Sequence, residues 1–266
     1  MTIIKRIKSK SAFHRKSITK TIYDSKKGHI GGSLSCIDIM CSIYYSKLFS
    51  FKKKDKFLLS KGHAALALYS ILYDLKYSKN FDTKKFNKYP SLLTEHPQIN
   101  NKLPGIEFES GSLGNGMGVG SGIAYANKLS KKKSKVIVLI GDGELYEGSC
   151  WEALLLSSQL KLSDILFIVD RNQLITLGST ENITKLNPLK KKFNSFGLNT
   201  METDGHDIKK IISKLKLFKN YKGKKANILI CNTIKGKGIS FIENKPEFHH
   251  KILNDIQYKK ALLELK

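Results

Sequence analysis

Two apolar segments of the chain each lead into an oxygen-bearing side chain. Val136–Ile140 is followed by Asp142, and Ile165–Val169 is followed by Asn172. Both segments have the length and the β-branched content of buried strands, and residues 147–160 between them are typical of a helix. This order predicts a βαβ unit, in which the carboxyl ends of both strands open on the edge of the sheet where α/β folds bind ligands.

The residue types at these two strand ends favour one kind of ligand. Asp142 offers an anionic oxygen and Asn172 an amide oxygen, and Mg²⁺ usually takes one or two side-chain oxygens while water and phosphate supply the others. Gly141 and Gly143 flank Asp142, so the backbone can approach a phosphate closely and Gly143 can present its N–H. The pattern therefore predicts a Mg²⁺–diphosphate site.

The segment GDGELYEGSCWEA, which begins at Gly141, resembles the thiamine diphosphate-binding motif in the form found in transketolases. A tight strand-to-helix turn would explain an isolated GDG, but here strand, acidic turn, helix, second strand and Asn172 follow one another in register. The resemblance implies thiamine diphosphate and Mg²⁺ as cofactors, with Asp142, Asn172 and the backbone carbonyl of Leu174 as metal ligands. Leu177 departs from the pattern, since relatives often have Asp there.

The elements before this motif supply two Gly-His loops. Residues 3–27 are expected to form a basic amphipathic helix, followed by a glycine-containing loop over 28–35 and a helix over about 36–48. A short strand from Phe57 ends at Gly62-His63, and a helix then runs to about Leu75. Transketolases have similar stretches at both places, which implies that His29 contacts substrate and His63 contacts the cofactor. If His63 is considered without the surrounding Gly-His loop, a structural role is the alternative.

Residues 76–104 are polar and irregular, and they contain His96. The glycine-rich segment from Gly111 to Gly122 is interpreted as a loop that enters a closely packed helix, the alternative being a flexible linker. The transketolase pattern GxLGxG resembles this segment and implies that Gly111 and Leu113 contact the cofactor. The same resemblance makes His96 a catalytic candidate.

The C-terminal part adds a lysine and a histidine pair. A strand over 226–233 leads to Lys235, which could reach a diphosphate, although a solvated lysine is the alternative in so lysine-rich a chain. Glu247-Phe248-His249-His250 resembles a W/F-H-G segment, with His249 at the histidine position and His250 where Gly is usual, so the choice between the two histidines stays open. The resemblance makes His249 a catalytic and cofactor-binding candidate, whereas His206 is interpreted as structural because Asp207 or Asp204 can cap a helix there.

The expected fold is a single α/β domain over residues 1–266, a three-layer sandwich with a mostly parallel central sheet. No segment approaches the length of a membrane span, and no leader with an apolar core is seen at the N-terminus. The four cysteines form no CxxC pair, so reduced thiols in a cytoplasmic protein are expected. Only three of the 47 basic residues are arginines, so the net charge of +25 is not interpreted as a specific nucleic-acid surface.

The family resemblance implies a function that needs a second chain. In transketolases the carboxylate that activates the cofactor lies in a pyrimidine-binding domain, and Glu147 matches a position that touches it across the interface. We therefore expect the N-terminal subunit of a split transketolase, in a homodimer of heterodimers, that transfers a two-carbon ketol unit between sugar phosphates of the pentose phosphate pathway. The helix that follows Gly111 should then present an apolar patch.

Two other functions remain open from the sequence. One is a subunit of another thiamine diphosphate enzyme, such as a 1-deoxyxylulose-5-phosphate synthase-like protein or a 2-oxoacid decarboxylase. The other is a non-catalytic cofactor-domain protein that is kept for its interface. Three histidines, His29, His96 and His249, favour a polyhydroxylated substrate because imidazoles can hydrogen-bond sugar hydroxyls and move protons near neutral pH.

Overall fold

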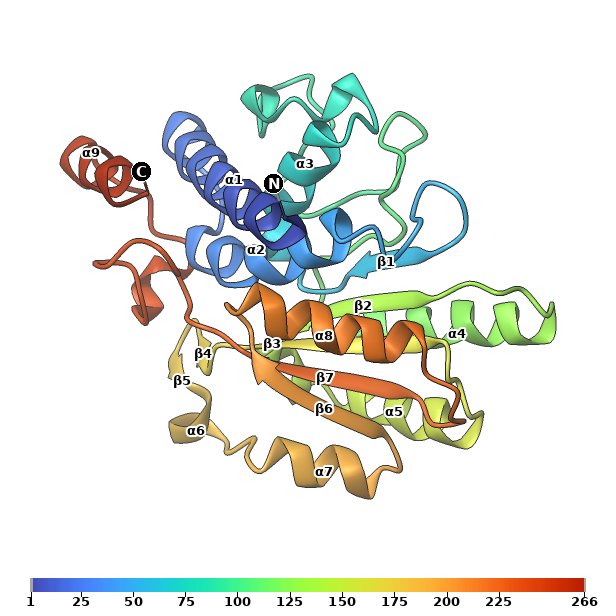
Figure 1. Ribbon diagram of the computed structural model, residues 1–266. Coiled ribbons are helices and arrows are strands. Elements are labelled where there is room, and N and C mark those ends of the chain that lie inside the picture. Colours follow the sequence, from blue (N-terminus) through green and yellow to red (C-terminus); the bar gives the residue numbers. More distant parts are fainter. Residues whose placement is uncertain (1, 266) are drawn as a thin grey trace.

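The computed structural model describes residues 2–265, and Figure 1 shows a central sheet with helices on both faces. The strands are β1 (Lys56–Leu59), β2 (Val136–Gly141), β3 (Ile165–Arg171), β4 (Leu174–Ile175), β5 (Gly178–Ser179), β6 (Asn199–Asp204) and β7 (Asn227–Asn232). The helices are α1 (Ile3–Ser25), α2 (Ile30–Tyr45), α3 (Ala65–Asp74), α4 (Gly116–Leu129), α5 (Gly148–Gln159), α6 (Thr180–Ile183), α7 (Leu189–Ser195), α8 (Ile208–Lys219) and α9 (Asp255–Glu264). The predicted α/β sandwich with a parallel sheet is confirmed.

The main sheet has the strand order β1-β2-β3-β7-β6 within residues 2–265, and every neighbouring pair is parallel. The chain passes from β2 through α5 to β3, then crosses to the outer strand β6 and returns through α8 to β7, beside β3. The two connections lie on opposite faces, so the strand order reverses between β3 and β7. In open α/β sheets such a reversal leaves a crevice beyond the carboxyl ends of the strands, where ligands bind.

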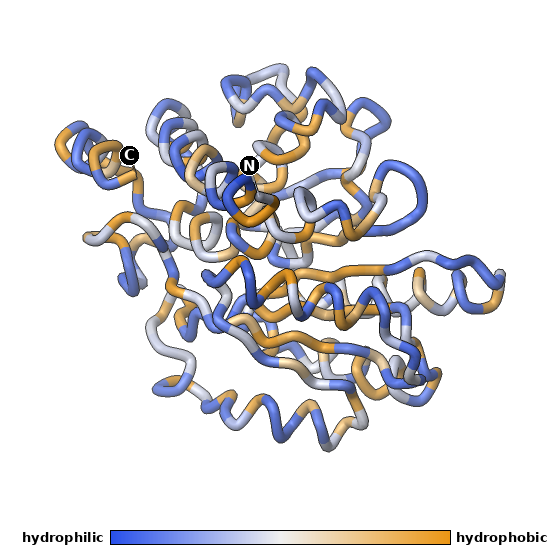
Figure 2. The backbone as a smooth tube through the Cα atoms, in the orientation of Figure 1, coloured by the Kyte–Doolittle hydropathy of each residue, from blue (hydrophilic) through white to orange (hydrophobic). Residues whose placement is uncertain are grey.

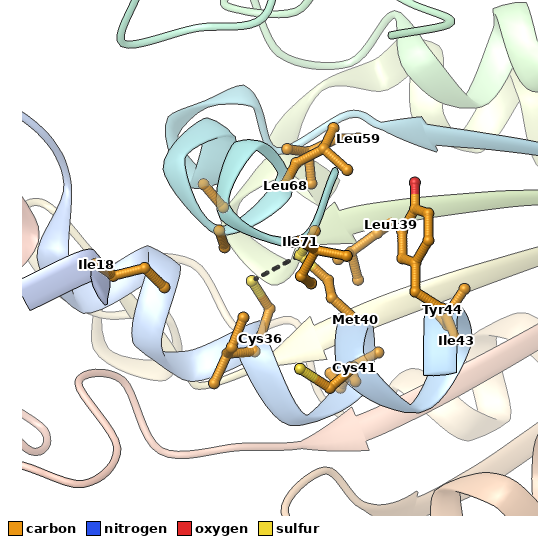
Figure 3. Close-up of a cluster of buried hydrophobic side chains, with 14 of the residues drawn as sticks. Ile18, Cys36, Met40, Cys41, Ile43, Tyr44, Leu59, Leu68, Ile71 and Leu139 are labelled. Carbon is orange, nitrogen blue, oxygen red and sulfur yellow. Dashed lines mark hydrogen bonds between the residues drawn. The ribbon is translucent and has the colours of Figure 1, made fainter. Parts of the chain in front are cut away.

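Alternate residues of the central strands enter two separate cores. Ile137 and Leu139 of β2 pack with α1, α2, α3 and α8, whereas Val138 and Ile140 pack with α4, α5 and α7. Figure 2 shows hydrophobic residues running along β2, β3 and β7, as expected for parallel strands covered on both faces. Figure 3 shows the first core around α2, where Cys36 and Met40 approach each other through their sulfur atoms at 3.8 Å.

Three features of the fold differ from the sequence-based expectation. The segment expected as a loop over 28–35 is helical from Ile30, because Gly31 and Gly32 serve close packing in the first turn of α2: a Cβ on Gly32 would lie 2.5 Å from Cδ2 of His63. The polar strand β6 and the C-terminal helix α9 were not anticipated. Strand β6 has no apolar alternation in its sequence, since most of its residues lie partly exposed at the edge of the sheet.

The expected helix cap at Asp207 is confirmed. Asp207 caps α8 by accepting a hydrogen bond from the backbone N–H of Lys210, and the ring of His206 is held by Asp38 and by the N–H of Ile234, which fits a structural role. All four cysteines of the chain are buried and free. Among the helices of residues 2–265, none is both long enough and apolar enough to cross a membrane.

Candidate active site at the strand ends

A cavity of about 330 Å³ opens at the carboxyl ends of β2, β3 and β7, where the strand order reverses. The β2–β3 register places Gly141 opposite Asp170, so Asp142 and Asn172 leave the sheet on the same edge. The cavity is lined by the following predicted site residues: His29, His63, His96, Gly111, Leu113, Asp142, Gly143, Asn172, Leu174, Lys235 and His249. Residues that are far apart in the sequence are therefore brought to one place.

Asp142 is buried and its carboxylate is oriented by the backbone. Its Oδ1 accepts a hydrogen bond from the N–H of Gly143 at 2.9 Å, and its Oδ2 accepts one from the N–H of Gln173 at 2.6 Å. Burial raises the pKa of Asp142, an effect opposed by the nearby Arg171 guanidinium. A bound cation would favour the charged carboxylate further.

Arg171 links this carboxylate to the segment that follows β3. Its guanidinium donates to Asp142 at 3.1 Å, to Thr180 at 2.9 Å and to Glu181 at 2.5 Å. Burial opposes ionisation of Glu181, but the hydrogen bond from Arg171 outweighs it and lowers the pKa of Glu181. This arginine was assigned no role from the sequence, although its place between Asp170 and Asn172 at a strand end was a usable signal.

Gly143 lines the cavity and also has local contacts that hold the GDG turn. Its N–H donates to Asp142, and a Cβ at this position would lie 2.4 Å from Cγ2 of Ile175. The β4–β5 hairpin therefore packs closely on the GDG turn. The departure at Leu177 falls at the tip of this hairpin, where the side chain is exposed.

Lys235 is buried, so the solvated-lysine alternative was wrong. Its Nζ lies 3.1 Å from the carbonyl oxygen of Leu174 and 2.9 Å from Nδ1 of His249. Burial, reinforced by the charge of Lys61, lowers the pKa of Lys235 to about 8. An anion in the cavity would offset this cost of keeping the ammonium charged.

Five histidine rings gather beside the lysine, on the α2 side of the cavity. The ring centroid of His29 lies 5.7 Å from that of His63, 5.6 Å from that of His96 and 5.3 Å from that of His249. Burial lowers the pKa of His29 to about 4 and that of His249 to about 3. These two rings are therefore neutral near pH 7, where each can both donate and accept a hydrogen bond.

The structure places His249, and not His250, in the cavity. His249 contacts Lys235, whereas His250 is more than half exposed and pairs with Glu95. Glu147 also lies apart from the cavity lining, exposed at the N-terminus of α5. Its Cβ is beside Gly114, so Glu147 belongs to the outer surface near α4.

Beneath the cavity lies a buried ion pair that was not predicted from the sequence. Lys61 contacts the Asp170 carboxylate, which also accepts hydrogen bonds from Ser35 and Thr233, and Lys61 donates to the carbonyl oxygen of Gly32 at 3.1 Å. Burial opposes charge on both groups, but each partner stabilises the other, which raises the pKa of Lys61 and lowers that of Asp170. The pair ties β1, α2 and β3 together.

Glu144 is a second buried group whose position was not anticipated. Its carboxylate accepts hydrogen bonds from Ser60 and from the N–H of Gly114 at 3.0 Å. Burial raises its pKa, although these donors oppose the shift. Because Gly114 belongs to the segment entering α4, Glu144 fixes that segment against β1.

The oxygen atoms at the strand ends fit a magnesium–diphosphate group. In the described part of the chain Asp142 accepts three hydrogen bonds, and Oδ1 of Asn172 and the carbonyl of Leu174 accept one each. A carboxylate can accept about four and a carbonyl about two. Each group thus retains an unused lone pair, and these are the hard oxygen donors that Mg²⁺ prefers.

Comparison with known proteins gives consistent matches. The family model described as "Transketolase, thiamine diphosphate binding domain" matches residues 10–264. An apulose-4-phosphate transketolase subunit of Phocaeicola vulgatus is 35% identical over 268 residues, covering 98% of this chain and 94% of that protein. A 6-deoxy-6-sulfo-D-fructose transketolase subunit of a Clostridium species is 33% identical over 244 residues, covering 90% of this chain and 88% of that protein.

A solved structure agrees with these matches. The transketolase of Campylobacter jejuni superposes with a TM-score of 0.89 at 27% identity, covering 100% of this chain but 43% of that one. The chain therefore spans less than half the length of this solved relative.

Proposed function

Because this chain belongs to the transketolase family and carries its thiamine diphosphate-binding domain, we propose that it is the cofactor-anchoring subunit of a two-subunit transketolase. The observation that carries the proposal is the convergence of Asp142, Asn172, Lys235 and the histidine cluster on one cavity. Bound thiamine diphosphate would supply the electron sink for making and breaking a carbon–carbon bond next to a carbonyl. We also propose a cytoplasmic location, since the buried thiols are unpaired.

The residues of the chain divide into an anchoring set and a substrate set. Asp142, Asn172 and the Leu174 carbonyl would hold Mg²⁺, and Lys235 would offset diphosphate charge from within the cavity. The rings of His29, His96 and His249 would hydrogen-bond the hydroxyls of a sugar and take or give protons there. The cofactor itself would be contacted by His63, Gly111, Leu113 and Gly143.

A second chain is proposed because the anchoring residues assigned above would hold only the diphosphate end of the cofactor. The two relatives above are named as subunits of transketolases. The proposal is supported by five large apolar side chains that lie exposed on α4 and α5, namely Val119, Tyr125, Leu129, Leu155 and Leu156. We propose that a subunit with a pyrimidine-binding domain covers this patch and meets Glu147, in a homodimer of heterodimers.

The proposed reaction is transfer of a two-carbon ketol unit from a ketose phosphate to an aldose phosphate, as in the pentose phosphate pathway. The names of the two relatives point to other donors, apulose 4-phosphate and 6-deoxy-6-sulfofructose. The assay should therefore use xylulose 5-phosphate and these two donors in parallel, each with ribose 5-phosphate, Mg²⁺ and thiamine diphosphate, with and without the candidate partner chain.

Turnover is expected only when both chains are present. Robust turnover by this chain alone would disprove the need for a partner, and turnover with only one of the other donors would reassign the substrate. Calorimetry provides an independent readout, because Asp142→Ala should abolish Mg²⁺-dependent cofactor binding while leaving the circular dichroism spectrum unchanged. Failure of the unaltered complex to bind thiamine diphosphate would refute the enzyme proposal.

A further inference from the structure

Three side chains at the rim of the cavity face one another away from the strand ends. Nε2 of His250 lies 3.1 Å from Oε2 of Glu95, and Nδ1 of His29 lies 3.7 Å from the same oxygen. The ring centroids of the two histidines are 4.6 Å apart. One nitrogen or oxygen atom from each side chain lies within 4.8 Å of the other two. The three come from the segment before α2, from the irregular segment before α4, and from the segment after β7.

One atom of this cluster lacks a partner. Nδ1 of His29 is buried and makes no hydrogen bond within the described residues, since 3.7 Å to Glu95 is too long for one. Buried polar atoms in folded proteins are nearly always paired with protein, water or an ion. The lone pair or proton of this nitrogen therefore needs a group that the chain itself does not provide.

The charge state of the cluster favours a cation. Burial lowers the pKa of His29 to about 4, so its ring is neutral near pH 7 and can offer a lone pair. Burial opposes ionisation of Glu95, but hydrogen bonds from His250 and Asn87 outweigh it and lower its pKa. One carboxylate with two imidazoles is a donor set suited to divalent transition metals, which bind neutral histidine and ionised carboxylate.

We propose that Nδ1 of His29, Nε2 of His250 and Oε2 of Glu95 form a binding site for a divalent transition-metal ion, with Zn²⁺ as the best-fitting example. Zinc bonds of about 2.0–2.2 Å place neighbouring ligand atoms roughly 3.3 Å apart in a tetrahedral site. The observed separations of 3.1 and 3.7 Å bracket this value. Three protein ligands leave a position open to water.

Ligand chemistry separates this site from the strand-end oxygens. Asp142 and Asn172 offer only oxygen, which suits Mg²⁺, whereas the rim site offers two imidazoles that Mg²⁺ binds poorly. The side chain of His250 is 58% exposed, so an ion can arrive from solvent. A bound ion would also immobilise His29 at the cavity wall and make turnover zinc-sensitive; this consequence alone rests on the proposed function.

Metal binding can be tested without any turnover. The full-length chain, stripped with a chelator and then freed of it, is titrated with ZnCl₂ in a calorimeter, in millimolar Mg²⁺ and without thiamine diphosphate. We expect one Zn²⁺ per chain. His250→Gly and Glu95→Gln should each weaken binding at least about tenfold, because each removes one of three ligands. Both side chains are partly exposed, so both variants should fold, which circular dichroism checks.

Asp142→Asn is the matched control, since it alters the other candidate metal site and should leave zinc affinity unchanged. Absence of zinc binding by the unaltered chain would overturn the proposal. So would zinc binding that survives in both rim variants, or that is lost in Asp142→Asn.

Discussion

The helices α2 and α4 both begin with glycines and lie on opposite faces of the same sheet, but the chain encloses only one of them. All 16 residues of α2 are buried, whereas five of the 14 residues of α4 are. On the outer side of α4 a Cβ at Gly118 or Gly122 would meet nothing within 4 Å. The difference shows that similar glycine-rich segments can have different structural roles. Helix α2 is part of the hydrophobic core, whereas α4 has one face exposed on the surface.

The outer surface of α4 and α5 resembles a protein–protein interface. Its exposed side chains include five large apolar ones, and the glycines of α4 between them would let another backbone approach closely. An apolar patch of this kind on a folded chain commonly marks a protein–protein contact. The buried and exposed helices can therefore be distinguished by substitutions that affect either folding or assembly.

The largest expected effect is on assembly. Leu155→Glu on α5 should weaken association with the partner chain at least about 100-fold, because it would bury an unpaired charge at the centre of the contact. Stability of the lone chain should not change, since this leucine is 57% exposed. Analytical ultracentrifugation of the mixed chains measures the loss.

Leu217→Glu on α8 is the matched control. This leucine is 56% exposed but lies on the other side of the sheet, so the charge should not affect assembly. Equal effects of the two variants would contradict the assignment of the interface to α4 and α5.

The largest effect on the stability of the lone chain, as distinct from its assembly, is expected beneath α2. Lys61→Met should lower the free energy of unfolding by about 3–5 kcal/mol, because it leaves the buried Asp170 carboxylate without its cation. Urea denaturation measures the change. The double variant Lys61→Met/Asp170→Leu should recover part of the loss, and failure to recover any of it would show that the pair acts mainly through packing.

Much of the site was predictable because its chemistry follows strand ends. Asp142 and Asn172 could be placed together from two apolar runs alone, since parallel strands end at one edge. His63, His96 and His249 could not, because their meeting depends on loops whose course has no periodic signal. For them the family resemblance was needed.

Other features depend on tertiary packing that a single sequence does not encode locally. The glycines at the start of α2 look like loop residues until His63 is seen packed on Gly32. Lys61 and Lys235 look like two more solvated lysines in a chain of net charge +25, but each is buried and has a partner. The contact between Glu95 and His250 joins positions 155 residues apart, so it also depends on tertiary packing and not on the local sequence.

A smaller, pH-dependent effect should come from Asp38 on α2. Burial alone would raise its pKa, but the hydrogen bond from His206 and the charge of Arg15 outweigh burial and lower the pKa to about 2. Because the folded pKa lies below the unfolded one, this group stabilises the fold above about pH 4, and the contribution is lost as pH falls toward 2. Its size is about 2 kcal/mol.

Comparison with Asp38→Asn isolates this contribution, because acid also increases the general repulsion within a basic protein. The difference in unfolding free energy between the two proteins should be largest at pH 5 and above and should shrink between pH 4 and 2. A difference that stays constant over this range would mean that Asp38 is not ionised with a lowered pKa in the folded state.

The last comparison uses paired glycine-to-alanine substitutions, one in each helix, and Gly122→Ala has the smallest expected effect of all. Gly32→Ala in α2 should destabilise the chain by about 1–3 kcal/mol, because its Cβ would overlap the ring of His63. Gly122→Ala in α4 should instead stabilise the lone chain by about 0.5–1 kcal/mol, since alanine favours a helix and the position is open. Thermal unfolding measures both changes, and we expect a lower melting temperature for Gly32→Ala and a higher one for Gly122→Ala. If the added methyl of Gly122→Ala also weakens association with the partner, the open space beside α4 is space that the partner fills; if association is unaffected, the contact lies elsewhere along the patch.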